Sequence, residues 1–277
     1  MKSNRLLRST AALAFSLCTT LGSHAAITAL NGGTQQWATA EWTAGVPGPT
    51  DTAFLNDNTE VTVGAGTTAL AQGIRMGNNT SATSRLVLAD GTLSATFIVI
   101  GDAPNSNAEF VQSGGVLSVQ NTKALDFEIG NPANAPTDAC FANAVFKGGE
   151  SSLADLRFNL RPFRETKLSV VGSKARINAA SLTAEVNATE SWTIGVLDFT
   201  FDAAGVSSII LSGNLALSEG KQFDLQVDGS AYKGTVKRFL LIDAAAATGT
   251  FHNIELKGFR PGAKVTVENG DVVLTIP

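Results

Sequence analysis

The stretch Met76–Val119, MGNNTSATSRLVLADGTLSATFIVIGDAPNSNAEFVQSGGVLSV, contains one sequence unit written twice. Each copy has an apolar residue followed by glycine, a polar loop, a short apolar run, a glycine turn and a Leu-Ser pair. The second copy follows the first after 24 residues without a gap, so that Gly77 matches Gly101 and Leu93 matches Leu117. A constant period of this length is typical of proteins in which each repeat forms one stacked unit. The pattern predicts two neighbouring coils of a β-solenoid.

The repeat also predicts a core. One coil cannot bury its inward face alone, and the next coil provides the cover, while glycine at the corners allows the positive φ angles at which the chain turns. Leucine-rich repeats have a similar period, but their Leu-x-x-Leu-x-Leu frame is missing and the Thr, Ser, Val and Gly content favours strands. The sequence therefore predicts an all-β protein, a right-handed parallel β-helix with the inward residues Leu86, Leu88, Leu93, Ile98, Ile100, Phe110, Leu117, Leu125, Phe127 and Ile129.

A third unit keeps the same order but is longer. Its apolar-glycine step falls at Ile129-Gly130 and its glycine pair at Gly148-Gly149, both later than the period of the first two units predicts. The surplus residues fall in Gln120–Ala124 and Asn131–Cys140, which have the composition of loops. Stacked repeats tolerate insertions that lengthen loops and leave strands intact. A local function would therefore lie in the loops that break the register, chiefly Asn131–Cys140.

The N-terminus has the features of a signal peptide that covers residues 1–25. A start with three Lys or Arg residues precedes an apolar segment, Ala11–Leu21, which is too short to span a bilayer. Small residues at positions 23 and 25 place cleavage after Ala25. A buried N-terminal helix is the structural alternative. We expect export to the extracellular space, the cell surface or the periplasm.

Cleavage would leave an acidic chain of low charge density. The whole sequence has 277 residues, 44% of them hydrophobic and 16% charged, which is enough for a sizeable core. Without the first 25 residues it has 17 Lys and Arg against 24 Asp and Glu, a net charge of −7. This balance argues against nucleic acid as a partner. Cys140 and His252 are then the only cysteine and histidine, so no disulfide, metal site or cofactor is predicted.

The first part of the mature chain, residues 26–63, is interpreted as an N-terminal cap. Trp37 and Trp42 flank a short polar segment interpreted as a strand, and the strand-like runs Asp51–Leu55 and Val61–Val63 follow. A terminal coil must differ from its neighbours because it exposes apolar surface and unpaired backbone. Two tryptophans that cover this end would meet that need, and a platform for stacking sugars is the functional alternative.

The same region resembles a known group of proteins. Trp37, Trp42–Pro47 and Asp51–Ala53, followed by Val61–Val63, are similar to the opening of autotransporter-passenger-like β-solenoid proteins, which are common among secreted and surface proteins of Gram-negative and planctomycete- or verrucomicrobia-type bacteria. The likeness covers about residues 37–150 well. It implies a fold and no shared catalytic residue. The chain lacks the motifs of a translocator barrel, a dockerin-like calcium loop or a sorting helix, so the mode of surface attachment stays open.

The repeats are assigned to residues 64–190, and residues 191–277 are predicted to form an antiparallel β-region that closes the solenoid. Turn signals occur at Glu219-Gly220, Asp228-Gly229 and Asn269-Gly270, of which the last is the strongest signal for a two-residue hairpin. The expected strands in this part are Leu197–Asp202, Ser208–Ser212, Phe223–Val227, Arg238–Ile242, Thr250–Leu256, Lys264–Glu268 and Val272–Ile276.

Two groups of charged residues are candidates for chemistry. Asp126 and Glu128 alternate with apolar neighbours and would share one face of a strand, where paired carboxylates could act on a glycoside or uronate. Arg157 and Arg161 would also share a face and could clamp a carboxylate or sulfate. Arg164 follows nearby, but the spacing of the surrounding acids matches no calcium loop. In the structural alternative, both groups form solvated strand faces with surface ion pairs.

Two functional hypotheses follow. The first is a secreted, non-catalytic structural or adhesive β-solenoid of the cell surface or extracellular matrix, whose partner is a glycan or a surface protein and which can self-associate through sheet faces or ends. The second is a β-helix carbohydrate-active enzyme, a lyase or hydrolase, or a glycan-binding protein, that acts on an acidic polysaccharide through Asp126, Glu128, Arg157 and Arg161. The repeat without a convergent catalytic motif favours the first. After residue 25, no segment is long and apolar enough for a transmembrane helix.

Overall fold

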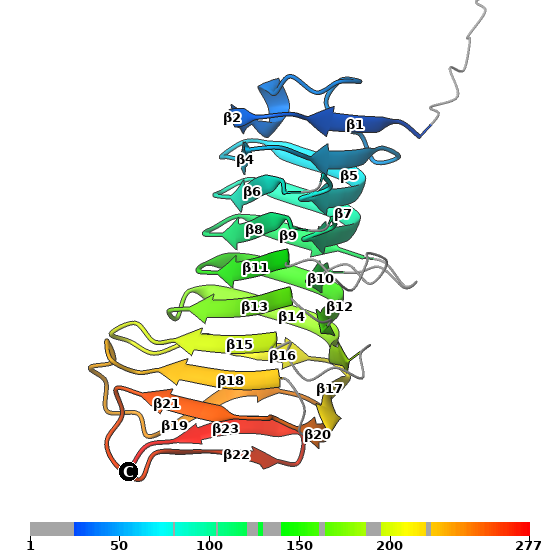
Figure 1. Cartoon of the computed structure of the whole chain (residues 1–277). Helices are drawn as coiled ribbons and strands as arrows, with labels where there is room; N and C mark the ends of the chain where they lie inside the picture. The colour runs from blue at the N-terminus through cyan, green and yellow to red at the C-terminus, as the bar shows by residue number, and fades with distance from the viewer. Residues whose placement is uncertain are drawn as a thin grey trace, which may run out of the picture.

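The computed structural model describes residues 25–79, 81–103, 105–120, 127–129, 140–160, 164–186, 195–219 and 223–277. The chain forms a β-solenoid of about seven turns, in which successive coils stack along one axis (Figure 1). The only helical element in the described part is the 3-10 helix η1 (Trp37–Thr39). The all-β solenoid that the repeats predict is therefore confirmed.

One side of the solenoid is a nine-stranded sheet in which all neighbours are parallel. Its strands follow one another in the order of the chain. Its strands are β2 (Gly33–Gln36), β4 (Thr59–Val63), β6 (Thr83–Leu88), β8 (Asn107–Gln112), β11 (Cys140–Phe146), β13 (Arg164–Val171), β15 (Gly195–Thr200), β18 (Phe223–Asp228) and β21 (Ile254–Lys257).

The other sides belong to a fourteen-stranded sheet. The first half of β7 pairs with β9 and its second half with β10, so a long strand in one coil corresponds to two short strands in the next. Its strands are β1 (Ile27–Leu30), β3 (Thr52–Leu55), β5 (Thr68–Met76), β7 (Thr92–Ile100), β9 (Val116–Val119), β10 (Phe127–Ile129), β12 (Gly149–Leu160), β14 (Ala175–Val186), β16 (Ile209–Leu211), β17 (Asn214–Glu219), β19 (Arg238–Asp243), β20 (Ala246–Thr250), β22 (Lys264–Glu268) and β23 (Asp271–Thr275).

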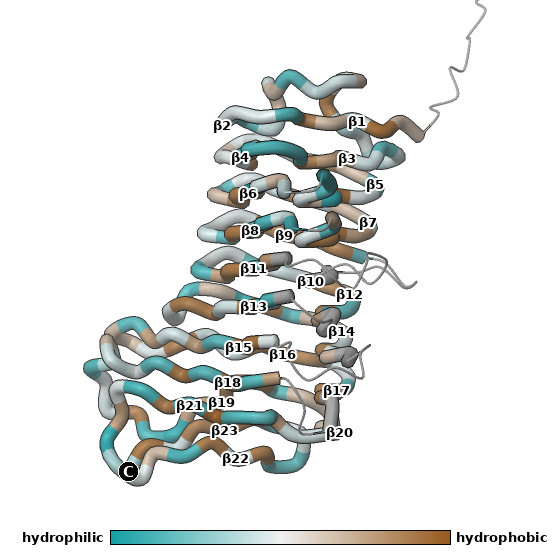
Figure 2. Tube along the Cα trace, in the orientation of Figure 1, coloured by the Kyte–Doolittle hydropathy of each residue, from teal (hydrophilic) through white to brown (hydrophobic). Residues whose placement is uncertain are grey.

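The core runs along the axis, and alternate residues of the strands are buried in it. Figure 2 shows hydrophobic and hydrophilic residues interspersed along each coil. Burying a leucine or phenylalanine side chain stabilises the fold by about 1.5–3 kcal/mol, so a column of such residues holds each coil to the next. The rings of Phe110 and Phe146, on adjacent strands, lie 6.0 Å apart between centroids. Seven of the predicted inward residues are fully buried: Leu86, Leu88, Leu93, Ile98, Ile100, Phe110 and Leu117. The side chains of Leu125, Phe127 and Ile129 lie outside the described part.

Glycines stack at one corner of the coils, as the repeat predicts. The N–H of Val116 donates to the carbonyl of Gly91, and the N–H of Glu150 donates to that of Gly115, both at 2.9 Å. Gly115 and Gly149 have φ angles of +67° and +80°. A Cβ on Gly115 would lie 2.2 Å from the Gly91 oxygen, and no real Cβ approaches an oxygen so closely. Glycine is therefore required here by both the backbone angle and the stacking distance.

The long third unit leaves the strand register intact. Asn107 pairs with Thr83 in the coil before it and with Phe141 in the coil after it, although the second step along the chain is the longer one. Strand β10 pairs in register with both β7 and β12. The added residues therefore lie between β9 and β10 and between β10 and β11, which confirms that the strands are kept. The predicted loop Asn131–Cys140 lies outside the described residues, apart from Cys140 at the start of β11.

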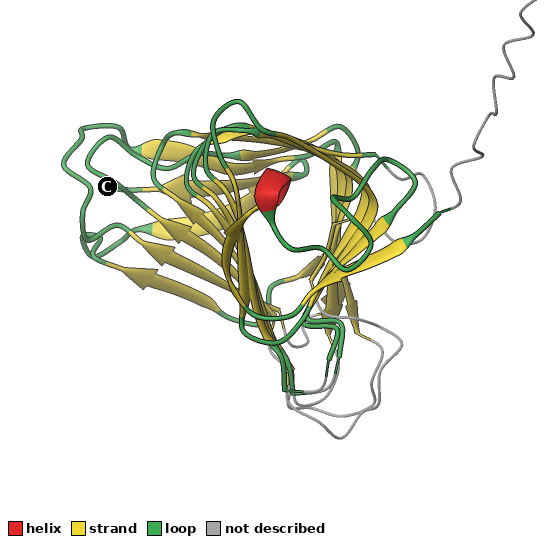
Figure 3. Ribbon diagram, turned by 90° about the horizontal axis from the view of Figure 1, so that it is seen from above, coloured by secondary structure: helices red, strands yellow, loops and turns green. Residues whose placement is uncertain are grey.

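The N-terminal boundary of the solenoid must be corrected. Residues 26–63 already contain coil strands, because β1 pairs with β3 and β2 with β4, all in parallel. The short helix η1 replaces the strand expected between Trp37 and Trp42, and it lies over the end of the solenoid (Figure 3). The repeat pattern did not identify these first coils, because they lack the apolar residue followed by glycine that marks the later coils. The signal peptide predicted for residues 1–25 lies outside the described part, except for its last residue.

The C-terminal region also differs from the prediction. Strands β15, β18 and β21 continue the parallel stacking, as do β16 and β19. In the described part of the chain, antiparallel pairing is limited to β23 with β19 and with β22, so the region predicted for 191–277 shrinks to these three strands. Alternating burial has a period of two in both kinds of sheet, so it does not determine strand direction.

Of the three predicted hairpin turns, one is present and two are not, because most strands in this region are parallel. Asn269 and Gly270, with φ angles of 53° and 102°, join β22 to β23 in the predicted two-residue hairpin. Asp228 and Gly229 end β18, but the next strand, β19, belongs to the other sheet. Strands β17 and β18 likewise belong to different sheets, so the hairpins expected at Asp228-Gly229 and at 219–220 are wrong.

Candidate functional site

The outer face of the nine-stranded sheet has a ladder of charged and polar side chains. Arg85 lies between two glutamates: its Nη1 is 3.1 Å from Glu60 Oε2, and its Nε is 2.8 Å from Glu109 Oε2. Asn143 Nδ2 donates to the other carboxylate oxygen of Glu109 at 3.0 Å. These four residues come from β4, β6, β8 and β11, which are consecutive strands of the sheet. The ladder therefore joins four coils through side chains alone.

Ion pairs continue along the same face toward the C-terminus. Lys167 Nζ is 3.0 Å from Asp198 Oδ2, and Lys257 Nζ is 3.0 Å from Asp228 Oδ2. A groove of about 360 Å³ follows this part of the ladder, and these four residues are among its lining. Each of these four charged side chains is therefore paired with an opposite charge. His252 is within hydrogen-bond distance of a neighbouring strand, with its Nδ1 2.9 Å from Asp224 Oδ1.

Two aspartates near this face are held in the ionised form. Burial would raise the pKa of Asp202, but hydrogen bonds from the N–H and Oγ of Ser173 and from the N–H groups of Gly205 and Ala204 lower it to about 2. The pKa of Asp228 is also lowered to about 2, chiefly by the side chain and N–H of Ser230 and then by Lys257. Asp202 thereby connects the turn after β13 to the loop after β15.

The predicted catalytic group is only partly described. Glu128 and Arg157 are register partners on neighbouring strands, β10 and β12, so the structure brings their backbones side by side. The side chain of Glu128 lies outside the described part, so only this backbone register is established. Asp126 and Arg161 lie outside the described residues, as does the side chain of Arg164, so convergence of the whole group on one face stays a prediction.

Two acids near these arginines in the sequence, Glu150 and Asp155, contact residues of the neighbouring coil. Glu150 Oε1 lies 3.0 Å from Arg176 Nη1 on an exposed part of β12 and β14. Asp155 accepts a hydrogen bond from Ser181, also on β14. Both contacts join neighbouring coils, as the ladder does. Among the residues that the structure describes, no group of three or more His, Cys, Asp or Glu side chains is placed to hold a metal ion.

The two N-terminal tryptophans are structural. Trp37 is 1% exposed and Trp42 is 7% exposed, and their rings pack edge to face with centroids 5.0 Å apart. The indole N–H of Trp42 donates to the Trp37 carbonyl at 3.0 Å. A sugar-stacking platform needs an exposed ring face. The sugar-platform alternative is therefore wrong for this pair, and the covering role is confirmed.

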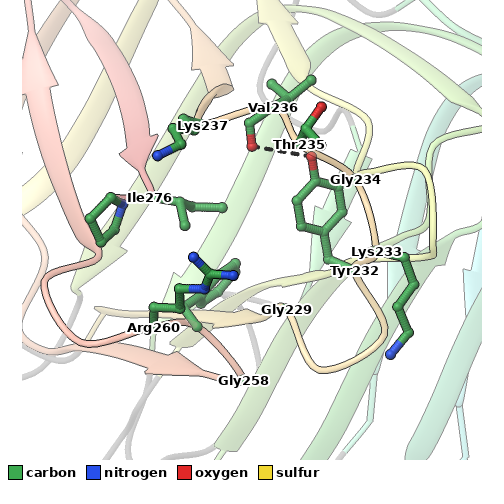
Figure 4. A pocket seen from close by; sticks show the side chains of 12 residues that line it. Gly229, Tyr232, Lys233, Gly234, Thr235, Val236, Lys237, Gly258, Arg260 and Ile276 are labelled. Carbon is green, nitrogen blue, oxygen red and sulfur yellow. Dashed lines mark hydrogen bonds between the residues drawn. The ribbon is translucent and has the colours of Figure 1, made fainter.

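A cavity of about 340 Å³ opens at the C-terminal corner of the solenoid. The loop 229–237, between β18 and β19, and the loop 258–263, between β21 and β22, form its walls together with Ile276 and Pro277. Figure 4 places Lys237 and Arg260 on the Ile276 side and Tyr232 on the opposite side, whereas the Lys233 side chain points away. The lining contains no Asp or Glu side chain.

An aromatic cluster supports this cavity from below. The Phe201 ring is buried, and the centroids of Tyr232, Phe239 and Phe259 lie 5.6, 4.8 and 5.5 Å from its centroid, all edge to face. Such pairs contribute about 0.5–1.5 kcal/mol beyond their buried area. The cluster therefore fixes the rings that line the cavity.

Sequence reasoning missed this cavity, although a signal was present. Residues 229–242 contain three Lys or Arg and no acid, and residues 256–267 contain Lys257, Arg260 and Lys264 and no acid. In a chain with an acidic balance, two acid-free basic stretches that flank neighbouring strands could have indicated a cationic site.

The fold and the side-chain pattern define a parallel β-solenoid protein with ion-paired faces and one cationic corner cavity. Comparison with known protein families, with curated protein sequences and with solved structures finds no match to this chain. The autotransporter-passenger-like resemblance therefore stays a prediction. No helix in the described part is long and apolar enough to cross a membrane.

Proposed function

We propose that this protein is an exported, non-catalytic scaffold of the cell surface or extracellular matrix that adheres to a partner through its solenoid surface. The observation that supports it is the ladder on the nine-stranded sheet. There, charged side chains from consecutive coils pair with one another, as in Glu60, Arg85 and Glu109. Charged side chains that pair between coils stabilise a long, rigid structure, which is what a scaffold requires.

The pKa shifts support the same function. A general acid that works near neutral pH needs a raised carboxyl pKa, which burial or a like charge provides. Four described carboxylates, those of Asp51, Asp202, Asp228 and Glu268, have their pKa values shifted, and every shift is downward. These groups accept hydrogen bonds as permanent anions, which is a structural role. None of the four belongs to the group Asp126, Glu128, Arg157 and Arg161, so the polysaccharide-active enzyme stays the second hypothesis.

Export is supported by the contacts at the predicted cleavage site. Strand β1 begins at Ile27, two residues after Ala25. The Ala26 nitrogen donates to Asp51 Oδ1 at 2.9 Å, and the Gly48 N–H donates to Asp51 Oδ2 at 2.8 Å. In the processed protein the Ala26 nitrogen would be a charged amine, which strengthens its bond to a carboxylate. Cleavage after Ala25 would leave strand β1 and these contacts of Asp51 in place.

The adhesive role is tested by surface binding. The exported protein is passed over immobilised polysaccharides, matrix proteins and whole cells on a sensor, and its self-association is measured by sedimentation. Specific, saturable binding to at least one surface, or assembly into oligomers, is the expected result. A monomer that binds none of them would overturn the proposal. Intact-mass analysis of the exported product tests the location: a chain that begins at Ala26 is expected, and an uncleaved chain retained in the cell would refute export.

A further inference from the structure

We propose that the cavity at the C-terminal corner binds an anionic sugar unit, with Lys237 and Arg260 on its carboxylate or sulfate group and the Tyr232 ring against the sugar. This inference rests on the proposed adhesive function and names the chemistry of its partner. It starts from an imbalance of charge. The cavity has cationic side chains and no acidic side chain, on a protein whose net charge is −4.

The cations of the cavity differ from most others on the protein. Six of the Lys and Arg side chains that the structure describes have neither an ion pair nor a side-chain hydrogen bond, and three of the six line this one cavity. On the nine-stranded sheet, by contrast, Arg85, Lys167 and Lys257 each have a carboxylate partner. Two unpartnered cations that face a common space attract an anion from solution. The six are Lys147, Lys174, Lys233, Lys237, Arg260 and Lys264.

The cavity is shaped before any ligand enters. A Cβ on Gly229 would lie 2.2 Å from the Phe259 ring, and a Cβ on Gly234 would lie 2.4 Å from the Tyr232 hydroxyl oxygen. The Tyr232 hydroxyl donates to the Val236 carbonyl at 3.1 Å and so closes the loop on itself. The loop 229–237 therefore packs against the Phe259 ring and against its own Tyr232 ring at distances that only glycine allows. A site with fixed walls loses little conformational entropy on binding.

The lining favours a sugar over a bare anion. The hydroxyl of Tyr232 is used within its own loop, so the part of this half-buried residue left for a ligand is the ring. Aromatic rings pack against the apolar face of a sugar, and an Arg guanidinium binds a carboxylate or sulfate through two parallel hydrogen bonds. The volume of about 340 Å³ is near the lower end of the range for small-ligand sites, about 300–1,000 Å³, which suits one or two sugar units.

Titration calorimetry of the protein produced from the full chain tests this. The probes are a di-uronic acid, a sulfated disaccharide of the same size, a neutral disaccharide and inorganic sulfate. Saturable binding of at least one anionic disaccharide is expected, weakened by salt, with the neutral disaccharide and inorganic sulfate at least about tenfold weaker. The two anionic probes show which charged group is preferred. No anionic sugar binding below about 10 mM, or equal binding of the neutral sugar or of inorganic sulfate, would overturn the proposal.

Matched variants locate the site. Lys237→Gln and Arg260→Gln should each weaken anionic disaccharide binding about tenfold, and Tyr232→Leu should weaken the disaccharide more than inorganic sulfate. Lys174→Gln, which removes an exposed, unpaired cation elsewhere, should leave affinity unchanged. Unfolding curves for each variant show whether it is folded. Wild-type affinity in the folded double variant of Lys237 and Arg260 would refute the site, even if surface adhesion persists. Sugar binding without any adhesion would refute the proposed function instead.

Discussion

The stacked glycine corner gives a sharp test of how the coils are held in register, through the substitution Gly115→Ala. Gly115 has a φ angle of +67°, and a Cβ there would lie 2.2 Å from the Gly91 oxygen and 2.9 Å from the Gly91 nitrogen. A left-handed backbone costs an alanine about 1–2 kcal/mol relative to glycine. Forcing a methyl group into a close-packed contact costs about 1–3 kcal/mol more. These two costs together lower the free energy of unfolding by about 2–5 kcal/mol, of which the smaller freedom of the unfolded alanine variant returns about 0.4–1 kcal/mol.

Gly66→Ala is the matched control. Gly66 has a φ angle of +73°, but a Cβ there meets nothing within 4 Å. This variant has the same backbone strain without the clash, and its less flexible unfolded chain returns about 0.4–1 kcal/mol in both variants. The difference between the two variants, about 1–3 kcal/mol, isolates the cost of stacking one coil on the next.

The measurement is urea unfolding, followed by both far-UV circular dichroism and tryptophan fluorescence. Repeat proteins do not always unfold in one step, so a free energy is meaningful only where the two probes give the same transition. Midpoints are then compared at constant m value. If Gly115→Ala and Gly66→Ala destabilise the protein equally within about 0.5 kcal/mol, the stacked corner accommodates a methyl group without a clash. The stacking argument would then be wrong.

Three further predictions concern the ladder, acid stability and the N-terminal end. Arg85→Met should destabilise the protein by about 1 kcal/mol at low salt and less at high salt, because the half-exposed guanidinium no longer separates the two glutamates that it bridges; urea unfolding at two salt concentrations measures this. The lowered pKa values of Asp202 and Asp228 stabilise the fold fully above about pH 4, and this stabilisation is lost as the pH falls toward about 2. Asp202→Asn should flatten the stability profile between those values, and an unchanged profile would contradict the assignment. Trp42→Phe should cost about 1–3 kcal/mol in thermal or urea unfolding, since it leaves the Trp37 carbonyl without its buried donor.

The sequence predicted the coils best where two constraints coincide. Between Met76 and Val119, apolar periodicity and the glycine corners repeat at the same spacing, and residues such as Leu93 and Leu117 are fully buried as expected. Asn269-Gly270 was also predictable, because its two residues adopt the positive φ angles that their types favour. In the coils the residue types and the period indicate the same structure, and in the hairpin the residue types alone do.

Strand direction was not predictable from the C-terminal strands. The residues of β15 and β18 alternate between buried and half-buried in the same way that an antiparallel sheet requires. The coil period there has also lengthened: Ser169 bonds to Asp198 and Lys257 to Asp228 across 29 residues, whereas Arg85 reaches Glu109 across 24. A repeat whose length changes along the chain is difficult to recognise in the sequence. The parallel coils at this end were therefore assigned to a separate region.

The ladder was predictable in principle. Glu60, Arg85 and Glu109 follow one another at spacings of 25 and 24 residues with alternating charge, which is the spacing of the coils. Side chains one period apart lie on neighbouring strands, so opposite charges at that spacing form pairs. The predicted pairs Asp126 with Glu128 and Arg157 with Arg161 were chosen within single strands, where alternation places residues on one face but leaves their cross-strand neighbours unknown.

The longer period at the C-terminal end explains why the cationic cavity lies there. Extra residues in a solenoid coil leave the strands in register, so they accumulate at the corners. In the third unit they lie between β9 and β10 and between β10 and β11, whereas in the last coils they lie in the loops 201–208, 229–237 and 258–263. Those three loops meet because their parent strands, β15, β18 and β21, stack directly on one another. Parallel stacking thus turns three separate insertions into one cluster, with Phe201, Tyr232 and Phe259 packed together beneath the cations. A solenoid can in this way acquire a binding site by lengthening one corner, while the ion-paired sheet that holds the coils together stays unchanged.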